Sequence, residues 1–187
     1  MIDDPVFCGL AVIFTFIFLL SVRSFLKILP ALGDCLLRWK GNVDLEDSLQ
    51  LSGSRNWIAI VLFVPFCMVA YSHGLYHPDY MDTLPPALGL AAFSGTMLAY
   101  LLLRFFLNWQ LEMGSYRTKA FMAANHAFYN YMIILFLIVF PVGAILNATV
   151  GNKELTRTIL LYIIAATYIV HIFRRGQIFA SACNPFT

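Results

Sequence analysis

Residues 121–146 read FMAANHAFYNYMIILFLIVFPVGAIL, and this stretch decides the fold class. From residue 132 to 139 it is purely apolar, and the whole run is long enough to cross the hydrocarbon core of a bilayer, which takes about 20 residues in a helix. Its first turns instead carry Asn125, His126 and Asn130. Polar groups at membrane depth are costly and face other helices or a water-filled cavity. The stretch therefore predicts a membrane-spanning helix whose polar end faces the inside of a bundle.

The rest of the chain has the same character. It is 60% hydrophobic and 12% charged, whereas in a soluble domain about half of the residues are apolar and about a quarter are charged. Five runs qualify as membrane spans, namely residues 6–22, 57–71, 85–107, 121–146 and 155–173. Pro65 and Pro141 predict bends in the second and fourth of them. The sequence thus predicts an all-α, polytopic transmembrane helical bundle that forms a single integral membrane domain over residues 1–187.

The Lys and Arg residues predict the orientation of the bundle. Of the 12, only Lys153 and Arg157 fall on the side that also holds the N-terminus and the loop after residue 73. The others fall in the connections after the first and third spans or after the fifth span, with Arg104 just inside the end of the third span. Because basic residues are retained on the cytoplasmic side, the N-terminus is expected outside and the end at residue 187 in the cytoplasm.

Residues 24–40 follow the first span and have the pattern of an amphipathic helix. Apolar residues recur at spacings of three and four, with Lys27, Asp34 and Arg38 on the opposite face. Such a helix is expected to lie on the cytoplasmic membrane surface. Residues 41–54 are polar and predict a cytoplasmic loop, after which Ser52 or Ser54 is expected to cap the next helix.

One polar cluster is the main candidate site. Arg104 and Asn108 lie one turn apart at the end of the third run, and Asn125, His126 and Asn130 open the fourth. Together they predict a cytoplasm-facing pocket for an anionic lipid headgroup or a partner helix. Alternatively, Arg104 extends to the interface and binds nothing in particular.

The histidines allow two further interpretations. His126 and His171 are expected at similar depth on neighbouring antiparallel helices, as the two axial ligands of a b-type haem would be; the alternative is ordinary hydrogen bonding at the interface. His73, His77 and Asp79 have spacing that can bind zinc, although Gly74 and Pro78 favour a solvated outer loop instead. The sequence leaves the cofactor undecided.

Other classes of function have little support. The apolar runs contain no Asp or Glu, so no carboxylate pair is available for proton transport or intramembrane proteolysis. Cys8, Cys35, Cys67 and Cys183 are scattered and predict neither a disulfide framework nor a thiolate metal site. The net charge of +2 does not indicate nucleic acid as a partner. The acidic residues after Met1 make a signal peptide unexpected, because signal peptides begin with basic residues.

Three short motifs carry a family resemblance. The sequence NHAF at 125–128 leading to Pro141, RRG at 174–176 and CNPFT at 183–187 resemble an integral membrane protein family of Bacteroidota that is classed as a domain of unknown function. The resemblance implies a bacterial inner-membrane location and one further apolar segment after residue 186, which would put the native C-terminus outside. It implies no activity, cofactor or catalytic residue.

Two functions follow from these observations. The first is a non-enzymatic assembly factor or subunit of an inner-membrane complex, in contact with membrane lipid and with a membrane-protein partner or as a homo-oligomer. The alternative is a ligand-binding protein or enzyme that holds haem or an anionic lipid headgroup in the cytoplasmic-side polar pocket.

Overall fold

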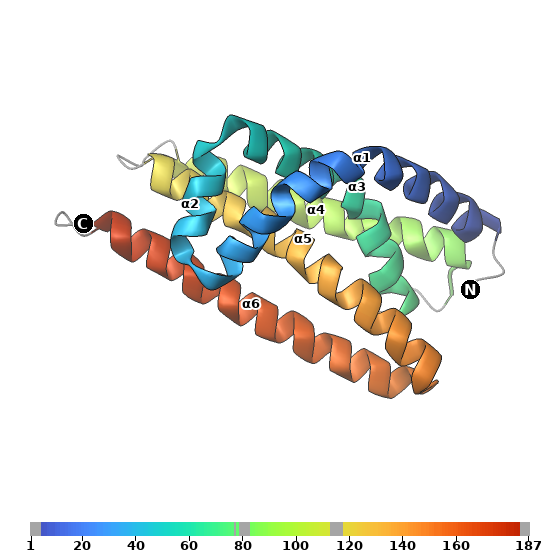
Figure 1. Cartoon of the computed structure of the whole chain (residues 1–187). Helices are drawn as coiled ribbons and strands as arrows, with labels where there is room; N and C mark the ends of the chain where they lie inside the picture. The colour runs from blue at the N-terminus through green and yellow to red at the C-terminus, as the bar shows by residue number, and fades with distance from the viewer. Residues whose placement is uncertain (1–4, 77, 79–82, 113–117, 184–187) are drawn as a thin grey trace.

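The computed structural model describes residues 5–76, 78, 83–112 and 118–183 as an all-helical bundle (Figure 1). The helices are α1 (Pro5–Leu37), α2 (Trp39–Asp47), α3 (Leu49–Ser72), α4 (Pro86–Glu112), α5 (Thr118–Thr149) and α6 (Lys153–Cys183). All except α2 are long and apolar enough to cross a membrane. The predicted helical bundle with five spans is therefore confirmed, and each predicted run lies within a longer helix except residue 85, which comes just before α4.

Helix α5 is the centre of the bundle and contacts every other helix, most extensively α6. The two ends of the described chain lie at opposite ends of the bundle, as an odd number of antiparallel spans requires (Figure 1). The short helix α2 lies at the end where α6 finishes. We call this the α2 end; it brings together the last turns of α1 and α6 and the polar first turns of α5.

The predicted separate amphipathic helix at residues 24–40 is wrong in its extent. Helix α1 continues unbroken from Pro5 to Leu37 and accommodates Pro30 in its interior. Its apolar face packs on protein rather than resting on a membrane surface, because Ile28, Leu32 and Cys35 join a core cluster with residues of α2, α3 and α5. The alternation of apolar and charged residues is real, but its apolar side is covered by neighbouring helices.

The predicted loop at residues 41–54 is also wrong, because these residues form most of α2 and the first turn of α3. The chain turns at Arg38, whose backbone is extended. A Cβ added to Gly41 would lie 2.6 Å from the carbonyl carbon of Asp34, so only glycine allows α2 to approach the last turn of α1 this closely. Ser48, not Ser52 or Ser54, caps α3 by accepting a hydrogen bond from the Leu51 amide.

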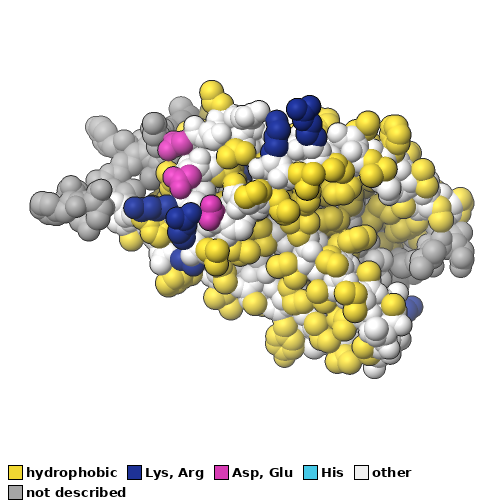
Figure 2. Space-filling model, in the orientation of Figure 1, with side chains coloured by type: hydrophobic (Ala, Val, Ile, Leu, Met, Phe, Trp, Pro, Cys, Tyr) yellow, Lys and Arg dark blue, Asp and Glu magenta, His cyan; other side chains and the backbone are white. Residues whose placement is uncertain are grey.

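The outer surface is largely apolar, as expected for helices in contact with lipid. On the face drawn in Figure 2, hydrophobic side chains cover most of the bundle and the acidic side chains lie together at the α2 end. Large exposed side chains are frequent on α4 and α6, among them Leu102, Phe105, Tyr162, Ile169 and Phe173. These two helices therefore present most of their surface to the surroundings, whereas the polar side chains of Asn42, Arg55 and Asn130 at the α2 end are buried.

Candidate functional site

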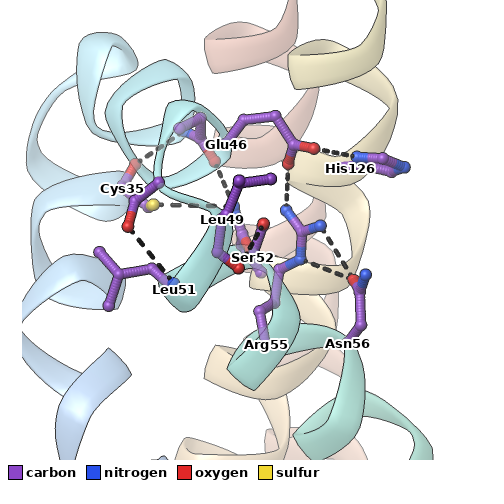
Figure 3. A network of polar contacts seen from close by, with 11 residues as sticks. Cys35, Glu46, Leu49, Leu51, Ser52, Arg55, Asn56 and His126 are labelled. Atoms are coloured by element: carbon purple, nitrogen blue, oxygen red, sulfur yellow. Dashed lines mark hydrogen bonds and ion pairs between the residues drawn. The ribbon is translucent and has the colours of Figure 1, made fainter.

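A carboxylate on α2 forms the first of two polar clusters at the α2 end. One oxygen of Glu46 accepts a hydrogen bond from Nη1 of Arg55 at 2.5 Å, and the other lies 2.8 Å from Nδ1 of His126 (Figure 3). The Arg55 side chain is only 1% exposed, and it also donates to Oδ1 of Asn56. Three helices, α2, α3 and α5, are thus joined through one carboxylate.

The two partners of Glu46 set its ionisation. Burial alone would raise the pKa of the Glu46 carboxyl, but the hydrogen bonds from His126 and Arg55, together with their charges, outweigh it and hold the pKa below its ordinary value. Glu46 is therefore ionised at neutral pH. It supplies the negative charge that the fully buried guanidinium of Arg55 requires.

A chain of amides extends this cluster to the end of α1. Asn130, which is fully buried, donates to Oδ1 of Asn42 at 2.9 Å, and Nδ2 of Asn42 lies 3.4 Å from the carbonyl oxygen of Cys35. The Tyr131 hydroxyl donates to the same carbonyl at 3.1 Å. Because the last carbonyls of a helix lack partners within it, these side chains complete the C-terminus of α1. We call Asn42, Glu46, Arg55, His126 and Asn130 the Glu46 network.

The next two carbonyls of α1 are completed from α6. One terminal nitrogen of Arg174 donates to the carbonyl oxygens of Leu36 and Leu37, at 3.2 and 2.9 Å, while the other donates to Oε1 of Gln177. Arg174 thus holds the last turn of α1 against α6. The α2 end is therefore fixed by side chains from α2, α3, α5 and α6 acting together.

The second polar cluster lies on the other side of α5 and is built around Arg104. Its guanidinium carbon lies 4.0 Å from the ring centroid of Phe128, an arrangement typical of a cation–π contact. Its hydrogen bond to the carbonyl oxygen of Asn125 is long, at 3.5 Å, and its Nε has no partner although it is shielded from solvent. Beside it, Asn108 donates to Oδ1 of Asn125 at 2.6 Å.

His171 and Arg175 of α6 complete this second cluster. The His171 ring is 3% exposed and lies between the rings of Phe128, Tyr131 and Tyr168, and its Nδ1 has no partner. Arg104 and Arg175 both interact electrostatically with His171 and with each other. We call Arg104, His171 and Arg175 the arginine cluster.

The five residues expected to form one polar pocket belong to these two separate clusters. Arg104, Asn108 and Asn125 come together between α4 and α5. His126 and Asn130 face α2 instead. Sequence reasoning missed the α2-end partners Asn42, Glu46 and Arg55, as well as Arg175. Asn42, Leu45 and Glu46 recur at spacings of three and four, and this pattern of a short helix with one inward face was the signal available for them.

The cofactor predictions are not decided by this geometry. His126 is engaged by Glu46 and His171 is packed among aromatic rings on another side of α5, so haem ligation by this pair stays a prediction. His73 packs close to Gly143, whereas His77 and Asp79 lie outside the described residues. Within the described part of the chain, no group of three His, Cys, Asp or Glu side chains is arranged to hold a metal ion.

A cavity of about 560 Å³ opens between α1, α3 and α5, away from both polar clusters. Its walls are almost entirely apolar and include Phe14, Phe18, Met68 and Phe140. Pro65 and Pro141, which lie inside α3 and α5, both line it. An apolar hollow at the depth of the spans is suited to lipid chains and offers no chemistry of its own.

No family model, curated protein or solved structure matches the chain. The resemblance to the Bacteroidota family therefore stays a prediction.

Proposed function

We propose that this chain is a non-enzymatic subunit or assembly factor of a complex in the bacterial inner membrane, and that its partner binds the outward face of α2. The observation that carries the proposal is the contrast between the two faces of this short helix. Gly41, Asn42 and Leu45 are buried against the bundle, whereas Lys40, Asp44 and Asp47 are exposed along one stripe. The Glu46 network holds this stripe in a fixed position.

The orientation that we propose puts the N-terminus outside and the α2 end in the cytoplasm. It is supported by the Lys and Arg residues, because all of them except Lys153 and Arg157 fall on the side of the predicted spans that holds the α2 end. In that orientation the outward stripe of α2 lies at the cytoplasmic surface. Here a soluble or membrane-bound partner has access to it.

The charges of the stripe indicate what kind of partner it accepts. Asp44 and Asp47 form no ion pair with any residue in the described ranges. The cytoplasmic leaflet of a bacterial membrane is anionic, so it repels an acidic surface. Leu37 and Leu49 flank α2 and are 74% and 91% exposed. The acidic part of the stripe, Asp44 and Asp47, together with these exposed leucines is complementary to a basic, partly apolar segment of another protein.

Photo-crosslinking in native membranes tests this proposal. A photoreactive amino acid replaces Asp44 or Asp47 in the full chain, and the matched control has it at Ile169, which is 66% exposed on α6. We expect one discrete protein adduct from the α2 positions and none of that size from Ile169. With the photoreactive residue at Asp44, the Asp47→Lys change should reduce the adduct, because it reverses one charge of the stripe.

Three outcomes are informative. An adduct with a different protein, lost on charge reversal, supports a subunit or assembly role. An adduct of twice the mass of this chain identifies a homo-oligomer instead. The absence of an adduct at both α2 positions, or adducts that persist equally after charge reversal, would show that this face binds no basic partner.

A further inference from the structure

Among the residues whose side chains the structure describes, the arginine cluster forms no ion pair with a carboxylate. The ion pairs among the described residues join Arg38 to Asp34, Arg55 to Glu46 and His126 to Glu46. None of them involves Arg104 or Arg175. Two guanidinium groups near each other in a partly buried site repel each other, and the low dielectric strengthens that repulsion. An anion close to both guanidinium groups would relieve this repulsion.

The surroundings position these side chains rather than leaving them free at the surface. The Phe128 ring contacts both the Arg104 guanidinium and, edge-on, the His171 ring. Arg175 lies with its guanidinium carbon 5.7 Å from the ring centroid of Phe179. Aromatic rings hold the flat face of a guanidinium and leave its N–H groups directed outward along its edge. Both guanidinium groups therefore lie against aromatic rings that can leave their N–H groups free for a ligand.

Two shielded nitrogen atoms in the cluster are without a partner. They are Nε of Arg104 and Nδ1 of His171, and the His171 side chain is 97% buried. Buried polar atoms are paired in the great majority of cases, so each exception calls for an explanation. An oxygen-rich anion would give these groups acceptors, because a guanidinium has only donors and an imidazole has at least one.

The position along the helices suits an interfacial ligand. Arg104 lies eight residues before the last residue of α4, Glu112, which corresponds to about 12 Å along a helix. Arg175 lies at a similar distance from the end of α6. A headgroup at the membrane surface is within reach of side chains as long as arginine from this depth.

We propose that Arg104 and Arg175, together with His171, bind the phosphate group of an anionic ligand at the α2 end. Guanidinium groups bind phosphate through paired hydrogen bonds, which makes phosphate the best fit among common anions. The phosphate belongs either to a lipid headgroup or to a soluble molecule. This site is separate from the outward stripe of α2, so it does not depend on the proposed partner.

Ligand titration of the purified full chain in neutral detergent tests the proposal. The probes are a short-chain phosphatidylglycerol, inorganic phosphate and, as a zwitterionic control, a short-chain phosphatidylcholine. The melting temperature, followed by tryptophan fluorescence, is measured against probe concentration to give an apparent Kd. We expect a saturable rise with phosphatidylglycerol, with inorganic phosphate or with both. Saturation by the lipid alone identifies a headgroup, and saturation by both shows that the phosphate suffices.

Variants separate this site from general attraction to a basic protein. Arg104→Gln and Arg175→Gln should each weaken the apparent Kd about tenfold, because each removes a charge-assisted contact. Arg38→Gln removes the same charge from an exposed pair with Asp34 and should leave the Kd unchanged. If a glutamine variant does not fold, Arg104→Lys and Arg175→Lys keep the charge, lose the paired geometry and should weaken binding about threefold.

Three results would overturn the proposal. The first is the absence of saturable stabilisation by either phosphate probe in the wild-type protein. The second is an equal Kd in the wild type and in the folded Arg104 and Arg175 variants. The third is stabilisation by phosphatidylcholine equal to that by phosphatidylglycerol, with no effect of inorganic phosphate, since it would reflect the acyl chains alone.

Discussion

The Glu46 network and the arginine cluster lie on two sides of the same helix, α5, and they differ in one respect. In the network, the buried cation Arg55 has a carboxylate at 2.5 Å. In the cluster, Arg104 and Arg175 interact with each other and have no carboxylate among the described residues. Both clusters use arginine near the same end of the bundle, yet only in the Glu46 network does a described carboxylate pair with it.

This difference indicates a structural role for the Glu46 network and a binding role for the arginine cluster. A buried ion pair whose hydrogen bonds are satisfied fixes helices relative to each other, and breaking it is strongly destabilising. A cation without a partner adds little to folding, because its favourable contacts must be supplied from outside. The network therefore explains how α2 is held in place, and the cluster is where a ligand has most to contribute. The predictions below test this contrast.

The largest effect is expected for Arg55→Ala. It leaves the ionised Glu46 without its main partner in a partly buried site and opens a cavity where a fully buried side chain stood. Removing one member of a buried pair costs about 3–5 kcal/mol. The free energy of unfolding in mixed micelles measures the loss. Arg38→Ala is the control, because its pair with Asp34 is exposed and should contribute about 0.5 kcal/mol or less.

A smaller loss is expected for Gly41→Ala. The added methyl group would collide with backbone atoms of Asp34, at 2.6 and 2.7 Å, so α2 must move away from α1 and strain the Glu46 network. Overpacking of this kind costs about 1–3 kcal/mol. Gly33→Ala in α1 is the matched control: nothing lies within 4 Å of its added methyl group, and the change should stabilise the helix by about 0.5–1 kcal/mol. Equal effects at both positions would contradict the close packing of α2.

The five spans were predictable because a run of about 20 apolar residues is a strong local signal. The course of residues 24–54 was not. An apolar stripe such as the one containing Ile28 and Leu32 looks the same whether it faces lipid headgroups or other helices. Only tertiary packing decides between them, and here it favours a continuous α1 packed on α3 and α5.

The sequence predicted where the polar residues of the candidate site lie, but not which of them contact each other. The polar first turns of α5 do face the inside of the bundle. However, Asn125 and Asn130 are five residues apart, which puts them about 140° apart around a helix, so they cannot line one pocket. The contact between Glu46 and His126 joins residues 80 apart in the chain. No local pattern gives such a pair.

A pH dependence of stability is expected from the Glu46 network. The folded-state pKa of Glu46 lies below its ordinary value of 4.5. Its stabilising contribution is therefore fully present above that pH and is lost as the pH falls through the folded-state pKa. The melting temperatures of the wild type and Glu46→Gln, measured from neutral pH into acid, should differ most at neutral pH and converge below pH 4.5. If the difference between the two melting temperatures instead grew in acid, Glu46 would not be the ionised, stabilising group.

The smallest effect on stability is expected for Arg104→Gln in the absence of ligand. The change loses the contact with Phe128, which is worth about 0.5–1 kcal/mol, and it also removes the repulsion between Arg104 and Arg175. Because these terms oppose each other, the free energy of unfolding in neutral detergent should stay within about 1 kcal/mol of the wild type. A loss as large as that of Arg55→Ala would mean that Arg104 is paired as firmly as Arg55. The distinction between a complete network and an incomplete cluster would then fail, since an arginine that stabilises the free chain this strongly already has its counter-charge.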